Sequence, residues 1–455
     1  EVLQLYVKCP DDKLKKAKKS LVAFAKTKCL KQNESESVDF EINLYDIASY
    51  DESASSYIIE KGEYAFYIGN SVNTDLLAGT VNLDEQVVKK LTPICPVQNP
   101  FKIITGETLQ KGKAVLKERI IENLPSETGF KGDKGFKLID VKNEKITLDE
   151  FISQLTNKEL EALTRGQGKM DSELGVIGNA GAFGGIIPSL RDKGIPPIIT
   201  TDGPAGVRIR KYTSLIPCGT ALACSWNTEL IEKLATVMGK ELKFHKSDVL
   251  LAPGMNIHRN VLCGRNFEYF SEDPLVSGKM AAAFVRGIQS AGVSACPKHF
   301  ACNNQEFKRT KNDSRLSERA LREIYLKGFE ICVKESKPLN IMTSYNKING
   351  VWSHYSYDLA TTVLRGEWGY TGNVMTDWWM QKSPSPEFPE IKDNAYRVRA
   401  QVDVLMPGGF RHIEKKYKSD GSLLKTLGRK NGITRGELER SAKNVLNLAL
   451  KIKMY

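Results

Sequence analysis

The chain has 455 residues, of which 41% are hydrophobic and 26% charged, a composition typical of a globular protein with two or three domains. No apolar run approaches the roughly 18 residues that a membrane-spanning helix needs, so the sequence excludes a membrane span. The formal net charge is +12, but the lysines are scattered and do not alternate with aromatic residues, so we favour a solvated basic surface over a nucleic-acid-binding site.

Residues 1–78 are predicted to form a β-sandwich. Strand-like segments lie at residues 2–8, 21–25, 38–44 and 57–69. The third segment, V-D-F-E-I-N-L, alternates apolar and polar residues, which indicates a strand with one buried face. A sandwich usually has about seven strands, and residue 1 already opens a strand, so we expect this module to lack its first strand or two.

Residues 79–145 are rich in lysine and interrupted by proline and glycine, as in G-F-K-G-D-K-G-F at residues 129–136. This composition predicts an irregular linker. Regular structure should resume at residue 146, because Thr147 with Glu150 and Thr156 with Glu159 form two successive capping boxes. Each box predicts the start of a helix.

Residues 146–455 alternate short apolar segments with amphipathic ones. Strands are predicted at residues 195–201, 249–252, 293–296, 340–343, 373–376 and 402–406. Among the intervening helices is one at residues 229–244, with Leu230, Val237 and Met238 expected on its buried face, and a last helix should follow Thr434. This alternation predicts an α/β fold, a TIM-like (β/α)8 barrel.

Polar side chains follow several of the predicted barrel strands. Asp377 ends one strand and Asp202 another, Lys298 and His299 follow a third, and Tyr345 a fourth. The carboxyl ends of barrel strands open onto the active site, so these groups are candidate functional residues. Lys298 should face a carboxylate, because buried lysines are rare unless they are paired.

Each candidate also has a structural alternative. Asp377 would then cap a helix, Asp202 would start a turn, and Tyr345 would pack in the core. Arg265 would pair with Glu272 or Asp273 in a structural ion-pair loop.

No metal or cofactor site is predicted. The nine cysteines contain no C-x-x-C pair and have no histidine partner at zinc spacing, which favours free thiols in a reducing, cytoplasmic compartment. The glycine-rich run at residues 178–185 lacks the G-K-[ST] ending of a phosphate-binding loop. We predict that this run forms a flexible loop over the barrel mouth.

Five segments, taken together, resemble glycoside hydrolase family 3, the β-glucosidase and β-xylosidase family. They are T-T-D-G-P-A-G-V-R at 200–208, G-R-N-F-E-Y-F-S-E-D-P at 264–274, K-H-F-A-C-N-N-Q-E-F-K-R at 298–309, I-M-T-S-Y-N-K-I-N-G at 341–350 and V-M-T-D-W-W at 374–379. The resemblance covers the whole chain, since residues 1 to about 75 look like the fibronectin-III-like domain of many members.

The resemblance implies a retaining hydrolase that removes terminal β-D-glucosyl residues from a β-glucoside or a short β-gluco-oligosaccharide. Asp377 would be the nucleophile of a covalent glycosyl-enzyme, and Asp202 would bind the far hydroxyls of the sugar. The remaining implied substrate-binding residues are Arg208, Arg265, Lys298, His299, Arg309, Met342, Tyr345 and Trp378. The sequence A-C-N-N at 301–304 replaces the histidine-containing loop of the N-acetylglucosaminidase branch, which argues against that branch.

The domain order resembles the subgroup in which the fibronectin-like module precedes the barrel, here at residues 146–455. In that subgroup an α/β sandwich domain upstream supplies the acid/base glutamate. We therefore expect the acid/base to come from a domain or chain outside this sequence, and a homo-oligomer is compatible with it. The alternatives are a β-xylosidase, another β-glycosidase of the family, or a non-catalytic carbohydrate-binding subunit.

Overall fold

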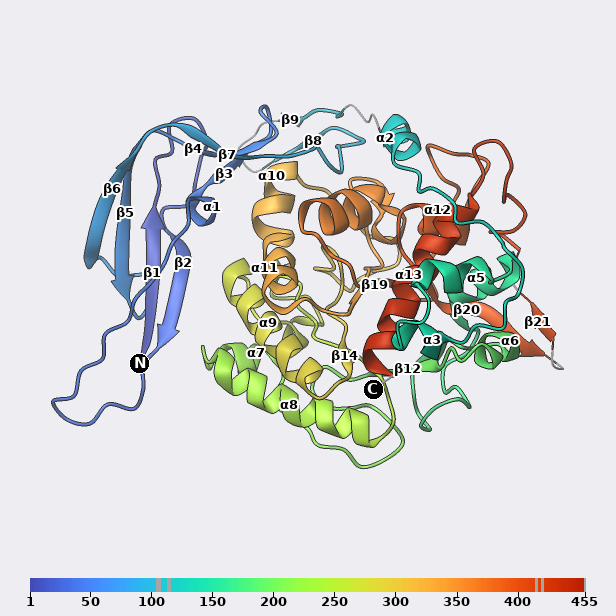
Figure 1. Cartoon of the computed structure of the whole chain (residues 1–455). Coiled ribbons are helices and arrows are strands. Elements are labelled where there is room, and N and C mark those ends of the chain that lie inside the picture. Colours follow the sequence, from blue (N-terminus) through green and yellow to red (C-terminus); the bar gives the residue numbers. More distant parts are fainter. Residues whose placement is uncertain (104–107, 113–115, 414–415, 419–420, 454–455) are drawn as a thin grey trace.

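The computed structural model describes residues 1–103, 108–112, 116–413, 416–418 and 421–453. It contains a β-sandwich and a barrel, joined by a long connecting segment (Figure 1). None of the helices in these ranges is both long and apolar enough to span a bilayer.

The β-sandwich has two antiparallel sheets. The larger sheet has the order β2-β1-β5-β6, and the smaller has the order β3-β4-β7. Their bounds are β1 (Val2–Lys8), β2 (Ser20–Lys26), β3 (Ser49–Asp51), β4 (Ser56–Ile59), β5 (Gly62–Gly69), β6 (Leu77–Leu83) and β7 (Gln86–Lys90). Val7, Ile47, Ile59 and Tyr64 form the buried centre between them.

One strand of the sandwich crosses the boundary predicted at residue 78, and another lies beyond it. β6 pairs with β5, and β7 pairs with β4, so the sandwich extends to Lys90. The predicted linker is correspondingly shorter and contains some regular structure. Its elements are β8 (Phe101–Lys102), β9 (Thr108–Leu109), α2 (Leu116–Glu122) and α3 (Leu138–Lys142).

The strand predicted at residues 38–44 is wrong. Burial does alternate there, since Val38, Phe40 and Ile42 are partly buried while the intervening side chains are exposed. The segment nevertheless pairs with no neighbouring strand, and it ends in the short helix α1 (Leu44–Ile47). The alternating burial therefore reflects an extended segment packed on the sandwich. Such a segment can bury every second side chain without pairing to a strand by hydrogen bonds.

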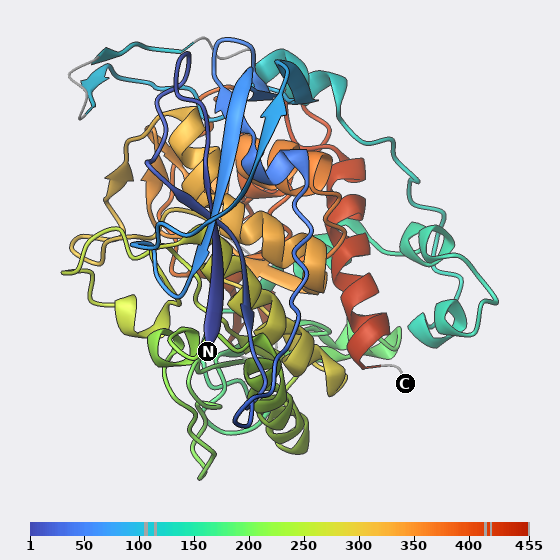
Figure 2. The same ribbon diagram turned by 90° about the vertical axis from the view of Figure 1, so that its left-hand side faces the viewer.

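The sandwich packs against outer helices of the barrel (Figure 2). Tyr50 donates its hydroxyl to Glu318 at 2.7 Å and its backbone N–H to Glu323 at 2.6 Å. Glu318 also accepts a hydrogen bond of 2.8 Å from the buried Arg322. These charged hydrogen bonds fix the orientation of the sandwich on the barrel.

Eight strands of the described residues form the barrel. Four make the arc β11-β12-β13-β14, and four make the arc β10-β20-β19-β16. A parallel bridge between Phe300 and Thr343 joins the two arcs. The bounds are β10 (Arg165–Gln167), β11 (Gly181–Gly184), β12 (Pro197–Asp202), β13 (Val249–Leu251), β14 (Ser294–Ala295), β16 (Asn340–Met342), β19 (Asn373–Trp378) and β20 (Val404–Ile413). The TIM-like barrel predicted from the sequence is confirmed, and all six predicted barrel strands are present.

β11 departs from the predicted pattern. It pairs antiparallel with β12, whereas the other pairs within the two arcs are parallel. The prediction of a flexible loop at residues 178–185 is wrong, because Gly181–Gly184 is a buried strand. The glycines permit this close packing: Gly184 has a φ of +76°, and a Cβ at Gly185 would collide with the carbonyl of Ile195.

Helices surround the barrel. Both predicted capping boxes are confirmed, with Thr147 at the start of α4 and Thr156 at the start of α5. The bounds of the helices are α4 (Leu148–Ser153), α5 (Asn157–Leu163), α6 (Pro188–Asp192), α7 (Gly219–Ala223), α8 (Thr228–Phe244), α9 (Pro274–Ser290), α10 (Glu318–Ala320), α11 (Lys327–Ser336), α12 (Asp393–Arg399) and α13 (Arg435–Ile452). The remaining elements of this region are η1 (Asn266–Glu268), η2 (Leu321–Tyr325), η3 (Ser353–Tyr355), η4 (Asp358–Glu367), β15 (Asp313–Ser314), β17 (Lys347–Ile348), β18 (Val351–Trp352) and β21 (Lys416–Lys418).

The buried face of α8 differs from the predicted one. Ile231, Ala235 and Met238 are buried, whereas Leu230 is 43% exposed and Val237 is 53% exposed. The buried stripe, which also includes Gly239 and Leu242, faces the neighbouring α9, which is itself rich in alanine.

Candidate active site

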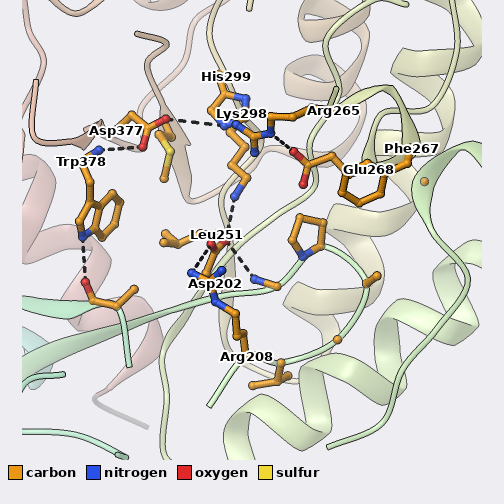
Figure 3. Close-up of a pocket in the computed structure, with 18 of the residues that line it drawn as sticks. Asp202, Arg208, Leu251, Arg265, Phe267, Glu268, Lys298, His299, Asp377 and Trp378 are labelled. Carbon is orange, nitrogen blue, oxygen red and sulfur yellow. Dashed lines mark hydrogen bonds and ion pairs between the residues drawn. The ribbon is translucent and has the colours of Figure 1, made fainter. Parts of the chain in front are cut away.

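A pocket of about 670 Å³ opens at the carboxyl ends of the barrel strands. This volume suits a small-molecule site. All ten residues singled out from the sequence line it, and Figure 3 shows several of them pointing toward one another. They are Asp202, Arg208, Arg265, Lys298, His299, Arg309, Met342, Tyr345, Asp377 and Trp378.

Asp377 lies near the end of β19, in the pocket wall. The preceding apolar residues of this strand are buried in the barrel, so the carboxylate is delivered directly to the pocket. Its Oδ1 accepts a hydrogen bond of 2.7 Å from the backbone N–H of Trp378. Its Oδ2 is buried and has no hydrogen-bond partner among the described residues. One oxygen of Asp377 is therefore held in place, and the other is available to a ligand.

The pKa of Asp377 reflects two opposing influences. Burial raises the pKa above its ordinary value, while Lys298, Arg265 and Tyr345 act in the other direction. Tyr345 and Asp377 influence each other, because burial and then the neighbouring carboxylate raise the pKa of the Tyr345 hydroxyl. The carboxylate thus sits in a poorly hydrated position beside cationic and hydroxyl groups.

Asp202, at the end of β12, is held much more firmly. Its Oδ1 accepts hydrogen bonds from Lys298 Nζ at 2.8 Å and from the backbone N–H of Gly203 at 3.0 Å. Its Oδ2 lies 2.8 Å from a guanidinium nitrogen of Arg208. Burial alone would raise the pKa of Asp202, but Lys298 and Arg208 lower it to about 2. The buried Lys298 does face a carboxylate, as predicted, and Asp202 is ionised at neutral pH.

His299 is buried beside Asp377. Its Nε2 lies 3.7 Å from Asp377 Oδ2. Burial, followed by the positive charges of Arg265, Lys298 and Arg309, lowers the pKa of the imidazole well below its ordinary value. His299 is therefore a neutral ring at neutral pH, and it does not form a charged pair with Asp377.

Two carboxylates that the sequence analysis missed hold the arginines of the site. Arg265 donates to Glu268, which also lines the pocket. Glu306 accepts a hydrogen bond of 3.0 Å from Arg309 and lies 4.0 Å from Arg265. The guanidinium of Arg309 lies over the ring of Tyr345, at 4.5 Å from its centroid. The carboxylates therefore fix both arginines at the pocket wall.

The partner of Arg265 differs from those considered in the sequence. Glu268 follows Arg265 by three residues, and both lie inside the segment G-R-N-F-E-Y-F-S-E-D-P. Asp273 instead caps α9, where its side chain accepts from the backbone N–H of Val276 at 3.0 Å. The spacing of three residues between opposite charges was the available signal for the observed pair.

Apolar and aromatic side chains form another part of the wall. Met342 and Trp378 are buried, and the Trp378 indole N–H donates to the carbonyl of Ala180 at 3.0 Å. Trp379 and Phe267 line the mouth, where they are 65% and 59% exposed. A pocket that combines charged groups with aromatic surfaces suits a ligand with many hydroxyls and apolar ring faces.

No cluster of three or more histidine, cysteine, aspartate or glutamate side chains in the part of the chain that the structure describes could hold a metal ion.

Comparisons with known proteins identify two regions. Residues 180–448 match the glycosyl hydrolase family 3 N terminal domain, and residues 1–72 match the fibronectin type III-like domain. A β-glucosidase of Ruminococcus albus is 43% identical over 465 residues, which cover 99% of this chain and 48% of that protein. β-Glucosidase A of Butyrivibrio fibrisolvens is 41% identical over 417 residues, which cover 83% of this chain and 49% of that protein.

A solved structure is also similar over the whole chain. The crystal structure of a β-glucosidase from Paenibacillus barengoltzii superposes with a TM-score of 0.92 at 40% sequence identity, covering 100% of this chain and 51% of that one. The present chain thus spans about half the length of the relatives it matches.

Proposed function

Because this chain belongs to glycoside hydrolase family 3, we propose that it is the catalytic barrel of a retaining β-glucosidase that acts on terminal non-reducing β-D-glucosyl residues. The observation that carries the proposal is the geometry of Asp377: a buried carboxylate with one fixed oxygen and one unbonded oxygen in a pocket of suitable size. The names of the most similar relatives favour glucose as the sugar.

The polar side of the pocket would bind the sugar hydroxyls. Asp202 is ionised and fixed by Lys298 and Arg208, so it presents acceptor oxygens to hydroxyl hydrogens in a set direction. The same cations can donate to the hydroxyl oxygens. Trp378 and Met342 would face the apolar surface of the sugar ring. This arrangement would place the anomeric carbon near Asp377.

Hydrolysis with retention then takes two steps. Asp377 Oδ2 attacks the anomeric carbon, the bond to the leaving oxygen breaks, and a second carboxyl group supplies the proton that this oxygen needs. In the second step that carboxylate takes a proton from water, the water attacks the anomeric carbon, and Asp377 leaves. Burial of Asp377 favours the covalent ester over the ion, which is compatible with the nucleophile's role.

The described pocket residues offer no free carboxyl group for the proton transfer. Asp202 is ionised at neutral pH and bound by Lys298, and Glu268 is bound by Arg265. We propose that an acid/base glutamate comes from an α/β sandwich domain outside this sequence. The chain spans only about half of its relatives, which leaves room for such a domain.

The same observation favours a second candidate. If no partner supplies a proton donor, the pocket would bind a β-glucoside without cleaving it, as a carbohydrate-binding subunit. The two candidates differ in the fate of a substrate whose leaving group needs no protonation.

β-D-Glucosyl fluoride is such a substrate, because fluoride departs without acid assistance. We expect each chain to release one fluoride quickly as the glycosyl-enzyme forms, and to yield β-glucose slowly because the second step lacks its base. A fluoride electrode follows the first step, and ¹H NMR of the anomeric signals follows the second. Asp377→Asn should abolish release, whereas Asp149→Asn, a change in an exposed surface pair with Lys443, should not affect it. Binding of glucose without fluoride release by the wild-type chain would instead support the carbohydrate-binding subunit.

A further inference from the structure

A chain of buried hydrogen bonds runs from Glu306 to the imidazole of His299. Glu306 accepts from Asn303 Nδ2 at 2.9 Å, and the same amide nitrogen donates to the hydroxyl of Tyr269 at 3.0 Å. That hydroxyl lies 3.2 Å from His299 Nδ1. On the other side of the ring, Nε2 faces Asp377 Oδ2 at 3.7 Å. The chain therefore connects an outer carboxylate to the carboxylate of Asp377.

The donor and acceptor in each of these hydrogen bonds can be assigned by starting from Glu306, which can only accept. Glu306 is held by Arg309 and is an acceptor, so the amide NH₂ of Asn303 must face it. That NH₂ also occupies the acceptor position of the Tyr269 hydroxyl. Tyr269 is fully buried, and burial raises its pKa, so the hydroxyl keeps its proton. Among the described residues, the acceptor left for this proton is His299 Nδ1.

Asn256 could in principle compete for Nδ1. Its Oδ1 lies 3.2 Å from Nδ1 and accepts the backbone N–H of His299 at 2.9 Å, and its second lone pair could also accept a proton from Nδ1. Its Nδ2 donates to the carbonyl of His299 at 2.9 Å, which fixes the orientation of the amide. A ring with the proton on Nδ1 would leave the Tyr269 hydroxyl without an acceptor and would turn the Nε2 lone pair toward Asp377. Both consequences are unfavourable in a buried site.

We infer that Glu306, Asn303 and Tyr269 are positioning residues that hold His299 in the tautomer with its proton on Nε2, directed at Asp377 Oδ2. This inference rests on the proposed role of Asp377. A separation of 3.7 Å is too long for a hydrogen bond. The N–H dipole nevertheless favours the ionised carboxylate and leaves Oδ2 unbonded, as a nucleophile requires.

The tautomer can be measured without any turnover. In a chain labelled with ¹⁵N-histidine, long-range ¹H–¹⁵N correlation spectra distinguish protonated from unprotonated ring nitrogens, and the signals missing in His299→Gln identify His299. We expect the proton of His299 on Nε2. A proton on Nδ1, or on both nitrogens, at neutral pH would overturn the inference, whether or not the protein is a glycosidase.

Tyr269→Phe tests whether the Tyr269 hydroxyl sets the tautomer of His299. Without the hydroxyl, Nδ1 has only Asn256 Oδ1 as a partner, so we expect the proton to move to Nδ1. Tyr64→Phe is the matched control, because Tyr64 is also a buried tyrosine with a bonded hydroxyl but lies in the sandwich. His299 should keep its tautomer in the control. An unchanged tautomer in Tyr269→Phe would show that the hydrogen-bonded chain does not set it.

A second readout links the tautomer to the chemistry. The rate of the first fluoride release by each chain, which reports the attack of Asp377, should fall at acid pH as Asp377 becomes protonated. In Tyr269→Phe the N–H that favours the carboxylate is lost, so this acid limb should move upward by about half a pH unit, because a dipole at 3.7 Å acts more weakly than a hydrogen bond. An acid limb at the wild-type position, together with a changed tautomer, would overturn the proposed effect on Asp377. Absence of release in the wild-type chain would contradict the proposed function and leave the NMR result intact.

Discussion

Replacing Asp202 by asparagine should destabilise the barrel by about 2 to 4 kcal/mol at pH 7. The lower value follows from the pKa of Asp202, which drops from the ordinary 3.8 to about 2. This difference corresponds to about 2.4 kcal/mol of folding free energy, at about 1.36 kcal/mol for each pH unit. The higher value adds the cost of leaving Lys298, whose side chain is 5% exposed, without a compensating charge.

The effect should depend on pH in a defined direction. The pKa of Asp202 is lower in the folded state than in the unfolded state, so its contribution to stability is complete above the ordinary value of 3.8 and is lost as the pH falls toward about 2. At pH 3, about half of the linkage contribution should remain. The difference between wild type and Asp202→Asn should shrink accordingly.

Urea unfolding followed by tryptophan fluorescence measures this difference. All five tryptophans lie between residues 226 and 379, so the signal reports on the barrel rather than the sandwich. Glu335→Gln is the control, because it removes a partly exposed ion pair between α11 and α9 and should cost less than about 1 kcal/mol. A loss in Asp202→Asn no larger than in this control, or equal losses at pH 3 and pH 7, would show that the ion pair between Asp202 and Lys298 does not stabilise the barrel as expected.

Three further variants test other parts of the account by the same urea titration. Burial raises the pKa of Asp377, so its ionised form disfavours folding at neutral pH. Asp377→Asn should therefore keep or increase the unfolding free energy at pH 7, and any gain should vanish as the pH falls below about 4. A large loss of stability would contradict the observed burial. Trp378→Ala should lower the unfolding free energy by about 3 to 5 kcal/mol, because the indole is buried and hydrogen-bonded to Ala180. Trp379→Ala at the exposed mouth should lower it by less than about 1 kcal/mol. Similar losses would argue against this difference in burial. Thr156→Ala should cost about 1 kcal/mol by removing the cap of α5, and an unchanged midpoint would show that this cap is dispensable.

The positions of the candidate site residues could be predicted from the sequence because the barrel imposes a simple rule. Asp202, Lys298 and Asp377 each lie at or just after a parallel strand, and parallel barrel strands bring such residues to the same end. The rule does not say which charges pair. Glu268 and Glu306 lie inside the segments used for the prediction, but opposite charges three residues apart also occur on exposed surfaces.

Local patterns failed where tertiary packing decides the structure. The glycine-rich strand β11 has no large apolar residue apart from Phe183, and its close contact with the segment before β12 becomes apparent only in three dimensions. Residues 38–44 show the opposite case, since a clear alternation of apolar and polar residues exists without a partner strand. Sequence periodicity reports which side chains face the core, and it does not report which backbone groups pair.

The face of α8 shows a different limit, because there the sequence pattern did not identify which side chains face the core. Leu230 and Val237 are larger and more apolar than Ala235, yet the alanine is buried and the two larger residues are partly exposed. The close approach of α9 explains why the small residue is the buried one, because a Cβ at Gly239 or Gly287 would collide with the opposite helix. The identity of the neighbouring helix therefore determines which stripe of α8 is buried.

If Asp377 is the nucleophile, as we propose, it forms a covalent bond to the sugar. Incubation with 2-deoxy-2-fluoro-β-glucosyl fluoride, followed by intact mass measurement and peptide mapping, tests it directly, because the fluorine slows the second step and traps the intermediate. We predict one added fluoroglucosyl group on the peptide that contains Asp377, and none in Asp377→Asn. A label on another residue, or no label even when a domain that supplies the acid/base is added, would contradict the proposed role of Asp377.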